Sequence, residues 1–292
     1  MQIIRKKSEM KDLRGIWARE GRVVGFVPTM GALHKGHITL VERSVAECDR
    51  TVVSIFVNPL QFGPKEDFGK YPRREKADCE MCEKAGADVV FIPTVEEMYP
   101  RGSGTVVEPH PALVSGMCGA KRPGHFRGVL TVVAKLFNIV QPNVAYFGQK
   151  DYQQCCVIEQ MVLDLDFPVK LVFVPTVREP DGLAMSSRNE YLSKEERKKS
   201  VCLYKALKEA ERMIVNEKEK EVSKIVERMK EIVQEAGGRI DYIEIVEPKS
   251  LRKVESIEES VVIGIAVFIG STRLIDNIIV CPNRGEIFCD AL

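Results

Sequence analysis

The sequence has almost no net charge, no long apolar run and no low-complexity tract, and each absence excludes a class of protein. Lys and Arg number 43 against 42 Asp and Glu, so no overall field attracts nucleic acid or an anionic membrane surface. No run of about 18 apolar residues is present that could cross a membrane. The 21 Gly and 15 Pro among 292 residues also exclude collagen-like and disordered chains. We therefore expect no nucleic acid and no membrane as partner.

The first residues, Met-Gln-Ile-Ile-Arg-Lys-Lys-Ser, lack the apolar core and the cleavage site of a secretory signal. The nine cysteines are an odd number scattered along the chain, which favours reduced, mostly buried thiols over a disulfide framework. We expect a cytoplasmic protein. Cys79-Glu-Met-Cys82 forms a CxxC without a second pair at zinc-ribbon spacing, in a stretch that is typical of a helix. Metal binding or redox chemistry at this pair remains an alternative.

Short β-branched or apolar runs alternate with helical spacing over the first 175 residues. In the intervening stretches apolar side chains recur at intervals of three and four, as in Ile38 to Val45 and Val129 to Val140. This alternation predicts an α/β fold, a Rossmann-like parallel sheet with helices on both faces, which binds ligands at the carboxyl ends of its strands. The expected strands are residues 23–27, 51–57, 88–92, 143–147 and 169–174.

The pattern changes near Val177. Ser193 and Glu196 form a capping-box pattern, and 22 of the 43 residues from 193 to 235 are charged, which indicates solvated amphipathic helices that end at Gly237-Gly238. The sequence predicts two domains, residues 1–177 and a smaller α+β domain of residues 178–292. The second domain should contain strands at 241–246, 261–268 and 273–280, with a hairpin at Ser271-Thr272.

The strongest local signal for a functional site is Val27-Pro-Thr-Met-Gly-Ala-Leu-His-Lys-Gly-His37, at the end of the first predicted strand. A helix that starts there offers backbone amides and a positive dipole end to an anion. Gly31 and Gly36 have no side chain to keep a phosphate from the backbone, and His34 and His37 lie one turn apart. A zinc pair and two structural histidines are the alternatives. Other phosphate-binding or nucleophile motifs, the P-loop, GxGxxG and GxSxG, are absent.

His34-Lys-Gly-His37 is similar to the HxGH signature of nucleotidylyltransferases and class I aminoacyl-tRNA synthetases. A larger set of motifs, in order and at matching spacing, resembles the pantoate–β-alanine ligase family over nearly the whole chain. These motifs are Pro28-Thr-Met-Gly-Ala-Leu-His-Lys-Gly-His37, Asn58-Pro-Leu-Gln-Phe-Gly63, Tyr71-Pro-Arg73, Gly124-His-Phe-Arg-Gly-Val-Leu-Thr131, Phe147-Gly-Gln-Lys-Asp-Tyr-Gln-Gln154, Pro175-Thr-Val-Arg178, Asp181-Gly-Leu-Ala-Met-Ser-Ser-Arg-Asn189 and Thr272-Arg-Leu-Ile-Asp-Asn277.

The resemblance implies a two-step ligation. The carboxylate of pantoate attacks the α-phosphate of ATP to give pantoyl adenylate and pyrophosphate, and β-alanine then displaces AMP to give pantothenate. It also implies Mg²⁺ held mainly by the ATP phosphates, and a homodimer formed through the first domain. Two other classes share parts of the pattern: another HxGH enzyme, such as a small adenylyltransferase or a synthetase fragment, and a nucleotide-binding regulator without catalysis.

The resemblance also assigns roles to residues. It implies that His37 acts as proton donor, that His34 and Lys150 act on the phosphates, and that the Met185-Ser-Ser-Arg188 segment belongs to a second domain that acts as a lid. Gln61 and Gln154 are expected to bind pantoate, and Gln61 also β-alanine. The expected ATP-binding residues are Met30, Gly31, Ala32, Leu33, His34, Lys35, Gly36, His37, Gly148, Gln149, Lys150, Asp151, Val177, Met185, Ser186, Ser187 and Arg188.

Three further expectations concern charge near these residues. Asp78 is expected to be a metal ligand, since some relatives carry a metal-linked acidic cluster there. Gln149 stands where many relatives have Glu, which leaves its role open. Arg122, His125 and Arg127 are expected to form either a basic flap over the phosphates or a solvated loop.

Overall fold

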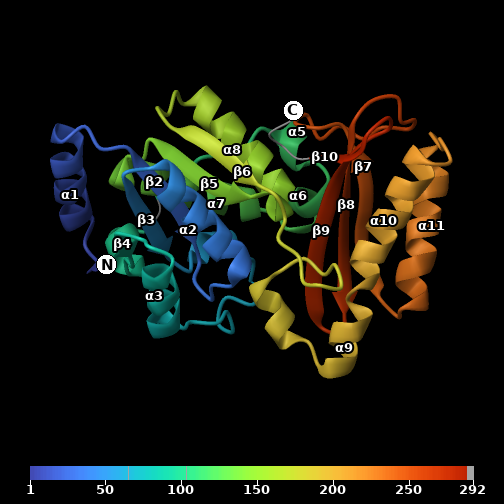
Figure 1. Cartoon of the computed structure of the whole chain (residues 1–292), viewed down its shortest axis with the longest axis horizontal. Coiled ribbons are helices and arrows are strands. Elements are labelled where there is room, and N and C mark those ends of the chain that lie inside the picture. Colours follow the sequence, from blue (N-terminus) through green and yellow to red (C-terminus); the bar gives the residue numbers. More distant parts are fainter. Residues whose placement is uncertain (65, 103, 288–292) are drawn as a thin grey trace. The chain divides into compact units, whose positions relative to one another are not determined.

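The computed structural model describes residues 1–64, 66–102 and 104–287, and it divides into two compact units (Figure 1). The first unit contains Met1–Pro109, Arg122–Gly148 and Val157–Val174, and the second contains His110–Lys121, Gln149–Cys156 and the chain from Pro175 onward. A single boundary, with domains of residues 1–177 and 178–292, misses the two short earlier segments. They group with the second unit because they pack against its sheet.

The first unit is built on a parallel sheet of six strands in the order β1-β4-β3-β2-β5-β6. Five of the strands confirm the five predicted runs. Strand β1 was not predicted, because its two isoleucines, Ile3 and Ile4, are followed directly by charged residues and belong to no longer apolar run. The strands are β1 (Gln2–Ile4), β2 (Val24–Thr29), β3 (Arg50–Ile55), β4 (Val89–Phe91), β5 (Val144–Gly148) and β6 (Lys170–Val174).

Helices cover both faces of this sheet, as predicted. Phe26 and Val27 follow one another in β2, so their side chains point to opposite faces, and both are fully buried. The Phe26 ring contacts Phe137 of helix α7, whereas Val27 packs with Leu40 and Val41 of helix α2. The helices of this part of the chain are α1 (Lys7–Arg19), α2 (Lys35–Glu47), α3 (Glu75–Lys84), α4 (Val95–Met98), α7 (His125–Val140) and α8 (Tyr152–Asp164), and the short 3-10 turn η1 spans Pro59–Gln61.

The second unit contains an antiparallel sheet in the order β10-β9-β8-β7, with two amphipathic helices packed on it. The three predicted strands and the hairpin are confirmed, and so is the capping box, in which Ser193 Oγ accepts from the Glu196 amide at 3.2 Å. The elements are α5 (Pro111–Val114), α6 (Met117–Lys121), η2 (Gln149–Asp151), η3 (Ser187–Tyr191), α9 (Lys194–Lys199), α10 (Cys202–Val215), α11 (Val222–Glu235), β7 (Arg239–Val246), β8 (Val261–Ile269), β9 (Thr272–Cys281) and β10 (Gly285–Ile287).

The strand order places a topological switch point beside β2. From β2 the chain adds β3 and β4 on one side of the sheet and then returns to add β5 on the other side. In parallel α/β sheets ligands bind outside the carboxyl ends of the strands at such a point. Strand β2 ends at Thr29 and β5 ends at Gly148, so the histidine motif and Lys150 each directly follow one of the two strands that flank it.

The cysteines agree with the expectation of reduced thiols. The eight cysteines of the described residues are all free, and six of them are buried. Cys289 lies outside the described residues. Within residues 1–64, 66–102 and 104–287, no helix is both long and apolar enough to span a membrane.

Candidate functional site

The segment between β2 and α2 forms a tight turn with an uncommon backbone. Gly31 and Ala32 both lie in the left-handed region, with φ of 81° and 50°. Thr29 fixes the start of the turn, because its Oγ1 donates to the carbonyl of Ser54 at 2.7 Å and accepts from the amide of Gly31 at 3.2 Å. Two consecutive residues with left-handed backbone angles therefore form one sharp turn at the end of the central strand.

Asp78 of α3 holds the middle of this turn. Its Oδ2 accepts from the amide of Ala32 at 2.9 Å and its Oδ1 accepts from the amide of Leu33 at 2.8 Å. The side chain is almost fully buried, at 2% exposure. Two buried carboxylate oxygens that accept from backbone amides constitute a structural anchor. No group of three His, Cys, Asp or Glu side chains in the described residues could hold a metal. Asp78 thus anchors the turn, and its role as a metal ligand stays a prediction.

His34 and His37 direct the same ring nitrogen toward the backbone. Nδ1 of His34, the N-cap residue of α2, accepts from the amide of Gly36 at 3.1 Å. Nδ1 of His37 accepts from the amide of His34 at 3.3 Å. A neutral imidazole that accepts at Nδ1 carries its proton on Nε2. The two rings lie 4.0 Å apart between centroids, with their planes inclined by 41°.

These hydrogen bonds change the expected chemistry of the helix start. The sequence predicts that backbone amides of this turn are available to a phosphate. That expectation is wrong for Ala32, Leu33 and Gly36, because their amides donate to Asp78 or His34. These three amides therefore serve the turn itself. The zinc alternative finds no third ligand among the described residues.

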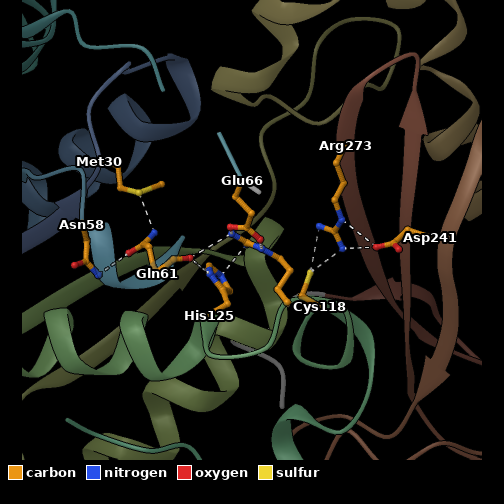
Figure 2. Close-up of polar contacts among 9 residues, drawn as sticks. Met30, Asn58, Gln61, Glu66, Cys118, His125, Asp241 and Arg273 are labelled. Carbon is orange, nitrogen blue, oxygen red and sulfur yellow. Dashed lines mark hydrogen bonds and ion pairs between the residues drawn. The ribbon is translucent and has the colours of Figure 1, made fainter. Parts of the chain in front are cut away.

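Gln61 lies at the end of η1 in the same unit, next to Met30 of the turn (Figure 2). Its Nε2 donates to Met30 Sδ at 2.9 Å, and its Oε1 accepts from Asn58 Nδ2 at 3.2 Å. Asn58 is itself fixed, because Tyr99 donates to its Oδ1 at 2.9 Å and its Nδ2 also donates to the carbonyl of Gly128. The structure thus brings together two residues that were predicted to bind ATP and pantoate.

Sequence reasoning missed a second set of contacts to Gln61, which Figure 2 also shows. His125 Nδ1 lies 2.8 Å from the carbonyl oxygen of Gln61, so Nδ1 donates and Nε2 accepts from Arg122 at 2.9 Å. Arg122 in turn pairs with both carboxylate oxygens of Glu66, at 2.7 and 2.6 Å. Burial raises the pKa of Glu66, but the hydrogen bonds and charge of Arg122 outweigh it and lower the pKa to about 2.

This network shows how two of the three basic residues of the expected flap or solvated loop are held. Arg122 is committed to Glu66 and His125, and Arg127 lies 3.3 Å from Glu108. Neither a basic flap nor a solvated loop describes Arg122, whose side chain is mostly buried. Glu66 carries no motif of its own, so only the tertiary structure identifies it as the partner.

The chain leaves β5 of the first unit at Gly148 and then forms the 3-10 turn η2, which belongs to the second unit and contains Gln149, Lys150 and Asp151. Gln149 is buried, and the Lys150 side chain is 19% exposed with its Nζ 3.9 Å from Asp151. Gln154 follows in the first turn of α8 and is half-buried. Lys150 therefore lies on a short turn that immediately follows a sheet strand.

The other predicted ATP segment follows a small hairpin of the second unit. Arg178 and Ala184 pair as an isolated antiparallel bridge, and the amide of Met185 donates to the carbonyl of Val177 at 2.9 Å. Ser186 is the N-cap of η3, where its Oγ accepts from the amide of Arg188 at 3.3 Å. The hairpin places Met185, Ser186, Ser187 and Arg188 on one defined turn rather than on an irregular loop.

The CxxC pair is structural. Cys79 and Cys82 belong to α3 and are buried in the core of the first unit. Burial raises the pKa of both thiols, that of Cys82 to about 12. A thiol that stays protonated is a poor nucleophile and metal ligand, so the metal and redox alternatives for this pair are not supported.

Comparison with known proteins identifies what the chain is similar to. Residues 2–279 match the model of the pantoate-beta-alanine ligase family. Pantothenate synthetase from Thermosipho africanus is 54% identical over 280 residues, which cover 96% of this chain and 100% of the relative. Pantothenate synthetase from Sulfurihydrogenibium sp. is 52% identical and covers 95% of this chain and 99% of the relative.

Solved structures show the same family relationship. Pantothenate synthetase from Thermus thermophilus matches with a TM-score of 0.89 and 47% identity, over 95% of this chain and 98% of that protein. The ligase from Francisella tularensis, complexed with beta-gamma ATP and beta-alanine, matches with a TM-score of 0.80 and 34% identity, over 95% of this chain and 97% of that protein. The chain belongs to the pantoate–β-alanine ligase family.

Proposed function

We propose that the histidine turn, Lys150 and residues 185–188 carry the ATP-dependent joining of pantoate to β-alanine that defines the family. In the first step a pantoate carboxylate oxygen bonds to the α-phosphorus of ATP, and the bond to pyrophosphate breaks. In the second step the β-alanine amine bonds to the acyl carbon and AMP leaves. Negative charge grows on phosphate oxygens in the first step, so that step needs fixed donors and cations.

The orientation of the two imidazoles is the observation that carries this proposal. Because Nδ1 of both His34 and His37 accepts from a backbone amide, each neutral ring is held by the turn and carries its proton on Nε2. Fixed donors stabilise developing charge without reorganisation during the reaction. We assign His37 as the proton donor to the reacting phosphate and His34 as its partner.

The second unit supplies positive charge and hydroxyl groups to the same reaction. The ammonium of Lys150 suits a phosphate oxygen as a compact charge, and the guanidinium of Arg188 suits two oxygens at once. The hydroxyl of Ser186 caps η3 through its oxygen, which leaves the O–H able to donate. The lid role of residues 178–292 belongs to this proposal, since closure would protect a hydrolysable adenylate from water.

Gln61 and Gln154 are assigned to pantoate, and Gln61 also to β-alanine. A neutral amide can orient a carboxylate without the strong pairing that an arginine would impose, so the carboxylate stays nucleophilic. Gln61 is suited to this task because Met30 and Asn58 hold its side chain and His125 contacts its carbonyl oxygen. An orienting residue gains from being held in place before the substrate arrives.

Mg²⁺ belongs to the proposal only as the ion that accompanies ATP. Mg²⁺ retains several waters and is bound largely by substrate phosphates. Asp78, the one expected protein ligand, directs both oxygens at backbone amides, so the described residues do not supply a protein cage for the ion. We assign no step to it.

A pyrophosphate-exchange assay tests the function. The protein is incubated with ATP, Mg²⁺ and labelled pyrophosphate, with and without pantoate, and β-alanine is then added. The proposal predicts exchange that requires pantoate, followed by AMP release that requires β-alanine. Exchange without pantoate, or release of ADP and phosphate, would refute the assignment.

Assembly and location are also proposals. The family resemblance implies a homodimer through the first unit, and a solution molar mass of one chain would contradict it. The free thiols of the described residues suit a reducing compartment such as the cytoplasm. Fractionation of the source cells would test that location.

A further inference from the structure

We infer that Asn277 of β9 is a positioning residue for the reaction, which holds the turn that carries Lys150. The closing motif Thr272-Arg-Leu-Ile-Asp-Asn277 matches the family but has no role in the chemistry described above. This inference rests on the proposed function, because it assumes that Lys150 acts on the phosphates of ATP.

The contacts are direct and lie within the second unit. Asn277 Nδ2 donates to the carbonyl oxygen of Gln149 at 3.1 Å and to that of Lys150 at 2.7 Å. Both N–H groups of one side-chain amide are therefore used on two consecutive carbonyls of η2. These carbonyls belong to a turn of three residues, too short to hold itself in place through its own ladder of hydrogen bonds.

The amide orientation follows from the same contacts. If the oxygen and nitrogen of the Asn277 amide were exchanged, its oxygen would face two carbonyl oxygens, which is repulsive. With Nδ2 facing the turn, Oδ1 is buried without a hydrogen-bond partner in the described part of the chain. Leaving a buried acceptor unsatisfied costs stability. At this position the two N–H donors of the asparagine amide form hydrogen bonds, whereas its oxygen acceptor forms none among the described residues.

Asn277 is itself anchored on both sides of its backbone. Its amide donates to Asp276 Oδ1 at 2.8 Å, and its carbonyl oxygen lies 3.4 Å from Arg178 Nη2. Arg178 and Asp276 form a bidentate pair at 2.6 and 3.1 Å, and Asp276 is fully buried. The support of Lys150 is therefore a paired strand residue and a buried ion pair, not a flexible side chain.

A double-mutant cycle with Lys150 separates positioning from general stability. The variants Asn277→Leu, Lys150→Ala and their combination are compared by pantoate-dependent pyrophosphate exchange and by thermal melting. Asn277→Leu should lower exchange by about 10-fold with little change in the KM for pantoate, while Lys150→Ala lowers it by about 100-fold. In the Lys150→Ala background the Asn277 change should have almost no further effect, because the group that it positions is gone.

Gln153 provides the matched control. Its buried amide likewise donates to two backbone carbonyls, those of Leu113 and Gly116, at 2.8 and 3.1 Å. Any effect of Gln153→Leu on exchange should persist unchanged in the Lys150→Ala background, since this residue holds another segment. If Asn277→Leu does not fold, Asn277→Ser, which retains one donor, is used in the same cycle.

Two results would overturn the inference. One is an Asn277 effect that multiplies fully with that of Lys150→Ala, as the control is expected to do. The other is exchange at the level of the unmodified chain in the Asn277 variants. If the unmodified chain itself shows no pantoate-dependent exchange, the proposed function fails, and that outcome is distinguishable from both.

Discussion

His37 accepts a hydrogen bond from the backbone amide of His34 through Nδ1, at 3.3 Å, so the turn itself uses one side of the imidazole. Two replacements separate the two sides of the ring. Asparagine can place an acceptor near the Nδ1 position, and glutamine can place a donor near the Nε2 position. His37→Asn should retain the melting temperature and lose about 100-fold in adenylate formation, the usual cost of one missing donor.

His37→Gln is expected to melt at a lower temperature than His37→Asn but to form adenylate faster. Thermal melting and pyrophosphate exchange measure the two effects separately. If both variants lose activity equally and neither changes the melting temperature, the division of the ring into a structural and a chemical side is wrong.

The tautomers can be observed without a substrate. His34 and His37 should carry the proton on Nε2, whereas His125, which donates from Nδ1 to the carbonyl of Gln61, should carry it on Nδ1. Nitrogen-15 spectra of the histidine rings at pH 8 distinguish a protonated ring nitrogen from an unprotonated one. A proton on Nδ1 of His37 would contradict the hydrogen-bond assignment from which the donor role follows.

Asp78→Asn tests the anchor of the histidine turn. A carboxamide has one oxygen and one NH₂ group, so it can accept from only one of the amides of Ala32 and Leu33. The free energy of unfolding should fall by about 1–3 kcal/mol, the cost of one unsatisfied buried donor, and the KM for ATP should rise.

Asp88→Asn is the control for that substitution. Asp88 also accepts from a backbone amide, that of Thr51 at 2.8 Å, but it lies at the start of the strands rather than at the turn. It should cost stability without changing the KM for ATP. An unchanged KM for ATP in Asp78→Asn would show that the anchor does not serve nucleotide binding.

Gln61→Glu tests the assignment of pantoate. The substitution retains the size of the side chain and places a carboxylate where the proposal puts the carboxylate of the substrate. Repulsion between like charges should raise the KM for pantoate by about 10-fold or more and leave the KM for ATP unchanged. Gln160→Glu, on the exposed side of α8, should change neither value. An unchanged KM for pantoate in Gln61→Glu would remove Gln61 from that role.

The Glu66–Arg122 pair predicts a pH-dependent part of the stability. The pKa of Glu66 falls from its ordinary 4.5 to about 2 in the folded chain, so the folded state binds the proton less readily than the unfolded state. The stabilisation is complete above about pH 5 and is lost as the pH falls toward 2. Since Glu66 is partly exposed, we expect about 2 kcal/mol, less than the full shift implies.

Glu66→Gln should therefore lower the free energy of unfolding at pH 7, and the difference from the unmodified chain should shrink as the pH is lowered from 5. Denaturant titrations at pH 7, 4.5 and 3.5 measure it. A difference that stays constant across these values would show that the charge of Glu66 does not contribute.

Much of the fold could be predicted because β-branched runs and helical spacing are local signals. Strands β2 to β6 of the first sheet and β7 to β9 of the second coincide with such runs. Strands β1 and β10 contain only two and one β-branched residues, too few to form such a run. The grouping of His110–Lys121 and Gln149–Cys156 with the second unit depends on contacts between residues far apart in the sequence, which periodicity does not record.

The candidate site shows the same division. The histidines, Lys150 and Gln61 could be chosen from their motifs, and their place after β2 and β5 or in η1 agrees with that choice. The motifs could not show which atoms already form hydrogen bonds within the protein. Asp78 is distant in sequence from the histidine turn, and only the folded chain shows that it accepts from two backbone amides there. Glu66 is likewise distant in sequence from Arg122, and only the folded chain shows that it pairs with the guanidinium.

The account depends most directly on one measurement, pantoate-dependent pyrophosphate exchange by the unmodified chain, His37→Asn and Lys150→Ala under the same conditions. The account predicts exchange only when pantoate is present, reduced by about 100-fold in each variant while ATP still binds. Exchange that is independent of pantoate, or that proceeds at full rate in His37→Asn and Lys150→Ala, would contradict it.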